Sequence, residues 1–549
     1  MNKISAVVAL SVGVALLGGV AWGQPSTAPS SLDEARSLQL EALNAVGLIL
    51  LDPARGEADR LRAAGVLAGH GGRVALPLLR AVLLDDPFPS VRRVVAEGLG
   101  DFGAPEAQFS LKQAALSGPT ASVRWAAGVS LLRVAPEASE VLGVLLGQRD
   151  TLAAAALSLQ DARAVAAFPD ALTEPVVDAF AQAFSDRQAF NNVERAALLK
   201  ALARLGAQTT VPLLSAAFND VAEDPFVRGA AAFGLGVLGA RQALPGLLSA
   251  LDNQEEALQV GALGAIVRLN DPRAVPALTA LLNSSTASVA VRAAAAGALG
   301  ALGDETVPAL AAVLDGAPEP DLRQAALEAL AAVGGKRAGA AVLTFVSSGF
   351  LSQCDPAVCG NLALSALAAL VKLGEADVAL QLFNAAFDAL KPALPFVFAF
   401  AEQNLVDVAV ALATVAPRVL DVLLGDPNPF VAALGLAALP RVRGQAARST
   451  LLRFVDPDQN RLLRRMAFEG LSPLAVAADT PLFAQALFDR DRRTRAAAFE
   501  AIARVGDARA VAPLFTALTS DELSLRLQAV AAAIAYGNRV LAAGEPTAP

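Results

Sequence analysis

Hydrophobic residues recur along most of this chain at intervals of three and four positions, which places them on one face of an α-helix. In the segment around Arg292, one such face is formed by Val291, Ala294, Ala295, Ala298, Leu299 and Leu302. Gly303 is expected to end this helix, and residues 304–306 offer side chains that cap the next one. A second apolar stripe follows over residues 307–314. The pattern predicts a helix, a short turn and a second helix, with too little interior to fold alone.

This two-helix pattern returns about every 31 to 33 residues, with an arginine at one position and a glycine eleven positions later. The arginines are Arg60, Arg92, Arg124, Arg195, Arg228, Arg292, Arg323, Arg464, Arg495 and Arg526. The glycines are Gly71, Gly103, Gly206, Gly239, Gly303, Gly334, Gly506 and Gly537, and we expect them to take left-handed backbone. Gln259 and Asn270 fit the same frame, since asparagine also tolerates left-handed backbone. We predict an all-α fold, an α-solenoid of about fifteen stacked helix-turn-helix units.

The recurring arginine is interpreted as a structural position that pairs with an acidic residue of the turn or of a neighbouring unit. Asp86 before Arg92 is an example of a suitable carboxylate, and Asp224 and Asp321 precede Arg228 and Arg323 in the same way. The alternative is direct contact with a ligand. Two further residues are candidate partner contacts. These are Arg93 and Trp125, although a tryptophan at this spacing more often packs in a core.

The N-terminus differs from the repeats. Lys3, the apolar stretch 4–20 and the small-x-small exit at 21–23 predict a cleavable secretory signal over 1–23, with an uncleaved anchor as the alternative. The chain is therefore expected to be exported to the periplasm, the cell envelope or the medium. The remaining boundaries are a flexible linker 24–31, repeats over 32–345, an inserted loop 346–361, repeats over 362–540 and a disordered tail 541–549.

The composition limits the choice of partners. The formal net charge is −8, which argues against nucleic-acid binding because that depends on basic surface. After the N-terminus no apolar run reaches the ~20 residues of a membrane span. The longest candidate is interrupted by Glu402, Asp407 and Arg418, so no integral span is expected.

The two cysteines, Cys354 and Cys359, lie in the predicted inserted loop. In an exported chain they are expected to form a local disulfide. The loop it would close is short, so the expected stabilisation is about 2 kcal/mol.

Three segments carry a family resemblance. They are Asp224-Pro-Phe-Val-Arg-Gly-Ala-Ala-Ala-Phe-Gly-Leu-Gly, Asp271-Pro-Arg-Ala-Val-Pro-Ala-Leu and Gly506-Asp-Ala-Arg-Ala-Val-Ala-Pro-Leu. These resemble the HEAT-repeat superfamily, in the short form called PBS-lyase HEAT-like repeats, over nearly all the mature chain. The resemblance implies the solenoid fold but says little about function, because such arrays serve many roles.

Two enzyme groups resemble this fold. Deoxyhypusine hydroxylase implies a di-iron site held by several His-Glu pairs, but His70 is the single histidine here and is followed by glycine. That activity is excluded. Bilin lyases act on intracellular clients, so the predicted export argues against their chemistry.

No cofactor, metal or catalytic motif is predicted. Residues 456–460 are similar to the start of a calcium loop, but Arg461 and Ala467 stand where glycine and a carboxylate are needed. The leading hypothesis is an exported, non-enzymatic scaffold that binds protein or peptide along its concave face. One alternative is an enzyme or enzyme accessory with its site in 154–194 or 336–362. Another is a self-associating envelope component that uses the apolar last helix near 531–537.

Overall fold

The computed structural model describes residues 31–166, 168–348, 356–375, 379, 380, 382, 383 and 394–544. Within these residues the secondary structure is helical and contains no β-strand, so the predicted all-α solenoid is confirmed. The chain divides into two compact units. Unit 1 holds residues 1–154 and 448–549, and unit 2 holds residues 155–447.

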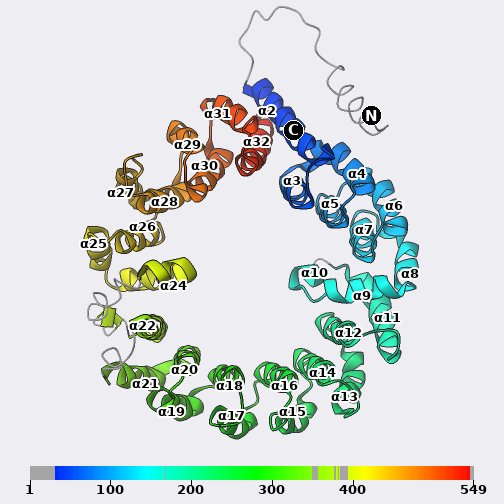
Figure 1. The fold of residues 1–549 in the computed structure, drawn as a ribbon, viewed down its shortest axis with the longest axis vertical. Helices are drawn as coiled ribbons and strands as arrows, with labels where there is room; N and C mark the ends of the chain where they lie inside the picture. The colour runs from blue at the N-terminus through cyan, green and yellow to red at the C-terminus, as the bar shows by residue number, and fades with distance from the viewer. Residues whose placement is uncertain are drawn as a thin grey trace, which may run out of the picture. The chain divides into compact units, whose positions relative to one another are not determined.

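Unit 2 is built from successive helical hairpins, preceded by α10 (Ala162–Ala166). The first helices of the hairpins are α11 (Thr173–Ser185), α13 (Val211–Asn219), α15 (Leu244–Ala250), α17 (Val275–Leu282), α19 (Val307–Gly316), α21 (Gly335–Ser347) and α25 (Arg418–Gly425). The second helices are α12 (Asn192–Arg204), α14 (Pro225–Val237), α16 (Glu256–Leu269), α18 (Val289–Leu302), α20 (Pro320–Val333), α22 (Pro356–Lys372) and α26 (Pro429–Arg443), and α24 (Leu394–Val415) packs between the last two. From α13 to α20 the second helices lie on the concave side of a curve and the first helices on its convex side (Figure 1).

Unit 1 contains hairpins from both ends of the chain. Its N-terminal helices are α2 (Ser31–Leu51), α3 (Glu57–His70), α4 (Leu76–Asp85), α5 (Pro89–Asp101), α6 (Gln108–Ser117), α7 (Ala121–Val134), α8 (Glu140–Leu146) and the start of α9 (Arg149–Ser158). Its C-terminal helices are α27 (Arg448–Leu451), α28 (Arg461–Leu471), α29 (Thr480–Ala486), α30 (Arg492–Val505), α31 (Val511–Leu518) and α32 (Leu523–Gly544).

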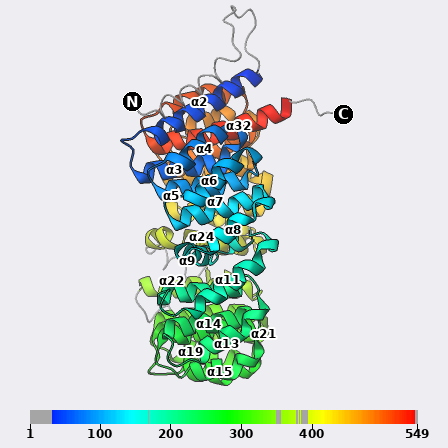
Figure 2. The same ribbon diagram turned by 90° about the vertical axis from the view of Figure 1, so that its right-hand side faces the viewer.

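The first and last described helices pack against each other within unit 1. Helix α2 lies along α32 and also contacts α31, and both ribbon views show α2 and α32 side by side (Figures 1 and 2). The buried face of α2 includes Leu38, Ala42 and Val46. Gln39 is 4% exposed and donates to the Ile534 carbonyl at 3.4 Å and to Asn538 Oδ1 at 2.7 Å. The last described helix, which is apolar, is therefore packed against the first described helix of the chain.

Small residues let the second helices stack closely. A methyl group placed on Gly300 would lie 2.8 Å from the Cα of Ala329 in the next second helix, closer than real side chains approach. Gly100 and Ser130 meet in the same way, with the Ser130 Oγ 2.6 Å from such a methyl group. Alanine, glycine and serine at these positions therefore set the short spacing between repeats.

The glycine frame is correct at most positions and wrong at three. Asn270 and the glycines at 103, 206, 239, 303 and 334 take φ between 48° and 102°. Gly71 is helical, and the left-handed residue is its neighbour Gly72. Gly506 has φ −56° and continues into an extended turn. Gly537 lies inside α32, which continues because α2 packs there: a methyl group on Gly537 would overlap the Gln39 side chain.

Several predicted boundaries shift or fall outside the described residues. The signal segment 1–23 and Cys354, with its predicted disulfide to Cys359, lie outside them, and of Cys359 only the backbone is described. Helix α22 begins at Pro356, inside the segment predicted as a loop, and α32 runs to Gly544, inside the predicted tail. No helix among the described residues combines the length and apolar character needed to cross a membrane.

Candidate functional site: an interrupted ladder of ion pairs

The recurring arginines first bond within their own hairpin. Nine of them lie in the first turns of a second helix and donate to a carbonyl at the end of the preceding first helix or in the turn just after it. Arg195 donates to the Phe184 carbonyl at 2.8 Å, and Arg292 Nε donates to the Leu282 carbonyl at 3.0 Å. The same bond is made by Arg60, Arg92, Arg124, Arg228, Arg464, Arg495 and Arg526. These bonds satisfy carbonyls at the C-terminal end of the first helix or in the turn that follows it.

Six of these arginines also reach the turn of the following hairpin, where they meet a carboxylate. The pairs are Arg60–Asp86, Arg124–Asp150, Arg195–Glu223, Arg292–Glu319, Arg464–Asp489 and Arg495–Glu522. The acid follows its arginine by 25 to 28 residues, as Arg195–Glu223 (28 residues) illustrates. Each pair therefore joins two consecutive repeats, and we call this series the arginine ladder.

Burial and charge reinforce the ladder. The Arg195 and Glu223 side chains are 3% and 6% exposed, and the Arg195 guanidinium lies 4.2 Å from the Phe184 ring centroid. A cation over an aromatic face adds stabilisation where water is excluded. Hydrogen bonding from Arg124 lowers the pKa of the Asp150 carboxyl, so this acid remains ionised and paired at neutral pH.

The ladder differs in detail from the pairs named in the sequence. The Asp86 carboxylate binds Arg60 of the preceding repeat, whereas Arg92 bonds the Asp86 carbonyl. Asp224 caps α14 and accepts from Asn192 instead of pairing with Arg228. Arg323 forms no ion pair in the described part of the chain, and its Nε is buried without a partner there. The acids therefore act mainly between repeats.

The ladder is interrupted at Gln259, which occupies the arginine position of α16. Its Nε2 donates to the Leu251 carbonyl at 2.9 Å, so the bond within the hairpin is kept. The bond to the next repeat is absent, because residues 283–288 are Asn-Ser-Ser-Thr-Ala-Ser and contain no carboxylate. Thr286 follows Gln259 by 27 residues, the offset that separates Arg292 from Glu319.

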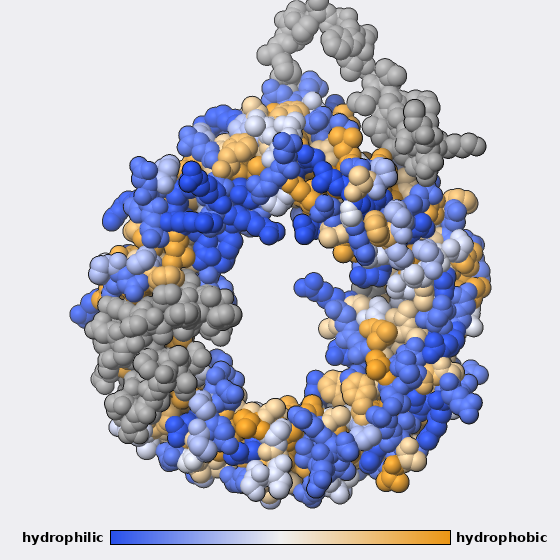
Figure 3. All heavy atoms as spheres, viewed as in Figure 1, coloured by the Kyte–Doolittle hydropathy of each residue, from blue (hydrophilic) through white to orange (hydrophobic). Residues whose placement is uncertain are grey.

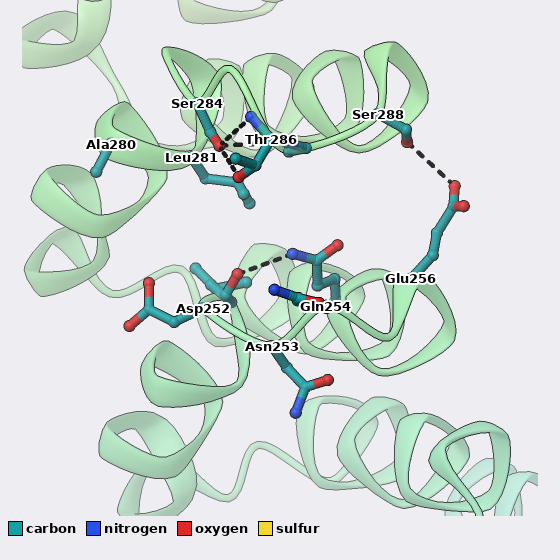
Figure 4. Close-up of a pocket in the computed structure, with 12 residues that line it drawn as sticks. Asp252, Asn253, Gln254, Glu256, Ala280, Leu281, Ser284, Thr286 and Ser288 are labelled. Atoms are coloured by element: carbon teal, nitrogen blue, oxygen red, sulfur yellow. Dashed lines mark hydrogen bonds between the residues drawn. The ribbon is translucent and has the colours of Figure 1, made fainter.

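A cavity of about 580 Å³ lies between the two turns at this interruption. One wall carries Asp252, Asn253, Gln254, Glu256 and Gln259, and the other carries Ser284, Thr286 and Ser288, as Figure 4 shows for its labelled residues. The Ser288 hydroxyl donates to Glu256 Oε1 at 3.3 Å and bridges the walls at one side. Sequence reasoning missed this cavity, although the loss of both an arginine and its acid in one repeat was a detectable signal.

The two candidate partner contacts differ in exposure. Arg93 is exposed and forms an ion pair with Glu97 at 2.7 Å. Trp125 is 3% exposed, so it packs in the interior and offers no surface anchor. His70 is an exposed residue at the end of α3. Among the described residues, no cluster of His, Cys, Asp or Glu side chains is arranged to hold a metal ion.

The concave face over α14, α16 and α18 carries few charges. Helix α14 has only Arg228 and α18 only Arg292, and both arginines donate to carbonyls of the preceding first helix. Helix α16 has two charged residues, Glu256 and Arg268, and both are exposed. Phe226 and Val260 are 42% and 50% exposed, and Figure 3 shows patches of hydrophobic colour over these helices. On α18 the exposed residues are Ala290, Ala294, Gly297 and Ala301. Interface cores are similarly depleted of charge.

Stacked helical hairpins joined by an arginine ladder define a repeat protein of the α-solenoid class. The model of the HEAT-repeat family matches residues 48–132, 177–259, 221–290, 244–331 and 284–347. The chain therefore contains HEAT repeats over these residues. Helical hairpins are also formed by the helices from α25 to α32, outside these matches.

Three solved structures are similar to the chain at low identity. Human deoxyhypusine hydroxylase is 22% identical, with 55% of this chain and 98% of that chain covered and a TM-score of 0.21. The karyopherin Kap121p bound to Pho4p is 14% identical, with 95% and 68% covered and a TM-score of 0.39. The CpcE–CpcF phycocyanin lyase from Nostoc is 19% identical, with 49% and 92% covered and a TM-score of 0.23. No curated protein matches the chain in sequence.

Proposed function

We propose that this protein is an exported, non-enzymatic scaffold that binds a protein or peptide partner on the concave face of α14, α16 and α18. The observation that carries the proposal is the low charge of these three consecutive second helices, whose charged residues are Arg228, Glu256, Arg268 and Arg292. A surface that spans three repeats, exposes apolar residues such as Val260 and carries few charges is weakly hydrated and favours contact with another polypeptide.

Charge placed in this face tests the proposal. Ala294 is exposed in the middle of α18, and Ala294→Glu introduces a carboxylate that a bound partner would desolvate. The matched control is Ala312→Glu, because Ala312 is also an exposed helical alanine but lies in a first helix, α19, on the convex side.

The experiment immobilises the full mature chain, exposes it to the extracytoplasmic fraction of the producing cell and quantifies retained proteins by mass spectrometry. A partner retained by the unaltered chain and by the Ala312→Glu control, and reduced at least about tenfold by Ala294→Glu, supports the proposal; tenfold corresponds to about 1.4 kcal/mol. Equal retention by both variants, or no partner retained by the unaltered chain, refutes it.

Export is supported by Lys3 and by the apolar stretch and small-x-small exit that follow it. N-terminal sequencing of the native protein from the extracytoplasmic fraction is expected to begin at Gln24. Recovery of the chain with its first 23 residues, in the cytoplasmic fraction, would contradict export.

A further inference from the structure

We infer that the cavity at the ladder interruption is a binding subsite for a basic side chain, the guanidinium or ammonium group of a bound polypeptide. The inference rests on the proposed function for the source of this side chain. The chemistry of the cavity itself comes from the repeat register and from the residues that line it.

The register places the cavity where other repeats hold their own guanidinium. In the next repeat, Arg292 spans the gap between two turns, bonding Leu282 on one side and Glu319 at 2.9 Å on the other. Gln259 bonds only the first side, because its carboxamide is shorter and Thr286 replaces the acid. The cavity of about 580 Å³ opens at this position. A group supplied by a partner can therefore take the place of the missing ladder arginine.

The lining selects a cation. Asp252 and Glu256 contribute two carboxylates, and the cavity is lined by no lysine or arginine. The carboxylate of Asp252 has no hydrogen-bond or ion-pair partner among the described residues, and Glu256 accepts only the long bond from Ser288. Carboxylates that line a concave space and have no paired cation favour a positively charged guest.

The amide oxygen of Gln259 adds an acceptor to the same wall. Gln259 is 8% exposed and spends its amide N–H on the Leu251 carbonyl, while its amide oxygen accepts no hydrogen bond from the described residues. On the opposite wall the Ser284 hydroxyl oxygen accepts from the backbone N–H groups of Thr286 and Ala287 and lies 3.0 Å from Thr286 Oγ1, so the Thr286 hydroxyl is the acceptor offered there. Acceptors on both walls suit a guanidinium, which carries five N–H donors in one plane and has no acceptor of its own.

The cavity adjoins the proposed partner surface. Val260, the residue after Gln259, and Ala290, two residues after Ser288, are both exposed on the concave face. A polypeptide lying over α16 and α18 can therefore insert one basic side chain between the two turns, while the concave face contacts the rest of that polypeptide.

The test uses acetyl-Gly-Arg-Gly-amide as the probe and the citrulline peptide as its neutral isostere, with binding to the full chain measured by saturation-transfer NMR titration. The arginine peptide is expected to bind at least about fivefold more tightly than the citrulline peptide, a difference of about 1 kcal/mol. Equal binding of the two peptides overturns the inference.

Two variants locate the site. The double variant Gln259→Arg with Thr286→Glu restores the missing ladder pair, fills the cavity from within and is expected to weaken probe binding at least about tenfold. Asp252→Asn with Glu256→Gln keeps the cavity but removes its charge, and is expected to remove the preference for arginine over citrulline. Ala312→Glu is the control for both. Unchanged probe binding by the two double variants, with helical content equal to that of the unaltered chain, overturns the inference.

Partner capture separates this inference from the proposed function. If the restored-ladder variant retains the partner fully while Ala294→Glu loses it, the subsite is refuted and the scaffold stands. If the arginine peptide binds the cavity but Ala294→Glu retains the partner fully, the scaffold surface is refuted and the subsite stands.

Discussion

The Arg195–Glu223 pair allows the ladder to be tested quantitatively. Replacing Arg195 by methionine leaves the Glu223 carboxylate, with a side chain only 6% exposed, without its main partner. Removing one member of a buried pair costs about 3–5 kcal/mol. We expect a value near the lower end, about 3 kcal/mol, because Arg187 remains 3.7 Å from the same carboxylate.

The double variant separates the pair from its surroundings. Replacing Arg195 and Glu223 together by methionine removes both buried charges and keeps similar volume, so the expected loss is only about 1 kcal/mol. The losses of stability of Arg195→Met and Glu223→Met, added together, are expected to exceed the loss of the double variant by about 2 kcal/mol or more. As a control, Arg337→Met breaks an ion pair with Asp304 whose side chains are 62% and 53% exposed, and is expected to cost no more than about 0.5 kcal/mol.

The assay must resolve local stability, because a chain with two compact units does not unfold in one step. Hydrogen exchange measured by mass spectrometry on peptides from α12 and α14 gives the local free energy of opening. The reasoning is refuted if Arg195→Met lowers this free energy by less than about 1 kcal/mol, or if the double variant costs as much as the two single variants together.

Three further predictions concern packing and charge. On α18, Gly300→Ala is expected to destabilise the protein by about 1–3 kcal/mol, because the added methyl group overlaps Ala329. Gly297 has open space around it, so Gly297→Ala is expected to stabilise the protein by about 0.5–1 kcal/mol. Equal effects of the two variants in urea unfolding would contradict close helix packing. The double variant Leu38→Glu with Ala42→Glu places two charges on the buried face of α2 and is expected to release this helix from α32. The exposed α32 is then expected to self-associate and to raise the molecular mass in solution, and light scattering that shows no increase would refute this. Arg273 hydrogen-bonds the Asp271 carboxylate and lowers the pKa of Asp271 to about 2. The ionised Asp271 therefore contributes to stability above pH 3.8, and this contribution is lost as the pH falls toward 2. The Arg273→Gln variant is expected to have a melting temperature that depends less on pH between 4 and 2. A pH profile identical to that of the unaltered chain would contradict this prediction.

The repeat frame was predictable because the ends of each hairpin are marked by residues close by in the sequence. Arg292, Gly303 and the apolar spacing between them are local signals, and the structure places α18 at Val289–Leu302 accordingly. The same frame failed at Gly537, since the glycine there serves a contact with Gln39, nearly 500 residues away. A contact of that range leaves no local pattern in a single sequence.

The cavity shows an intermediate case. Gln259 in the arginine position was visible as a departure from the frame, and so was the absence of an acid near Thr286. What these departures mean together depends on the ladder running between repeats, which only the structure reveals. The sequence predicted pairing with an acid of the turn or of a neighbouring unit, and it named Asp86 beside Arg92, whereas the Asp86 carboxylate binds Arg60 of the preceding repeat.

The packing of α2 on α32 imposes an order on biogenesis. Gln39 bonds Ile534, 495 residues further along, so the ribosome makes this helix long before its partner exists. At roughly 5–20 residues per second, the interval is on the order of 25 to 100 s. During that time the face formed by Leu38 and Val46 is bare on the nascent polypeptide. A chaperone that recognises short apolar segments can therefore bind α2 until translation is complete.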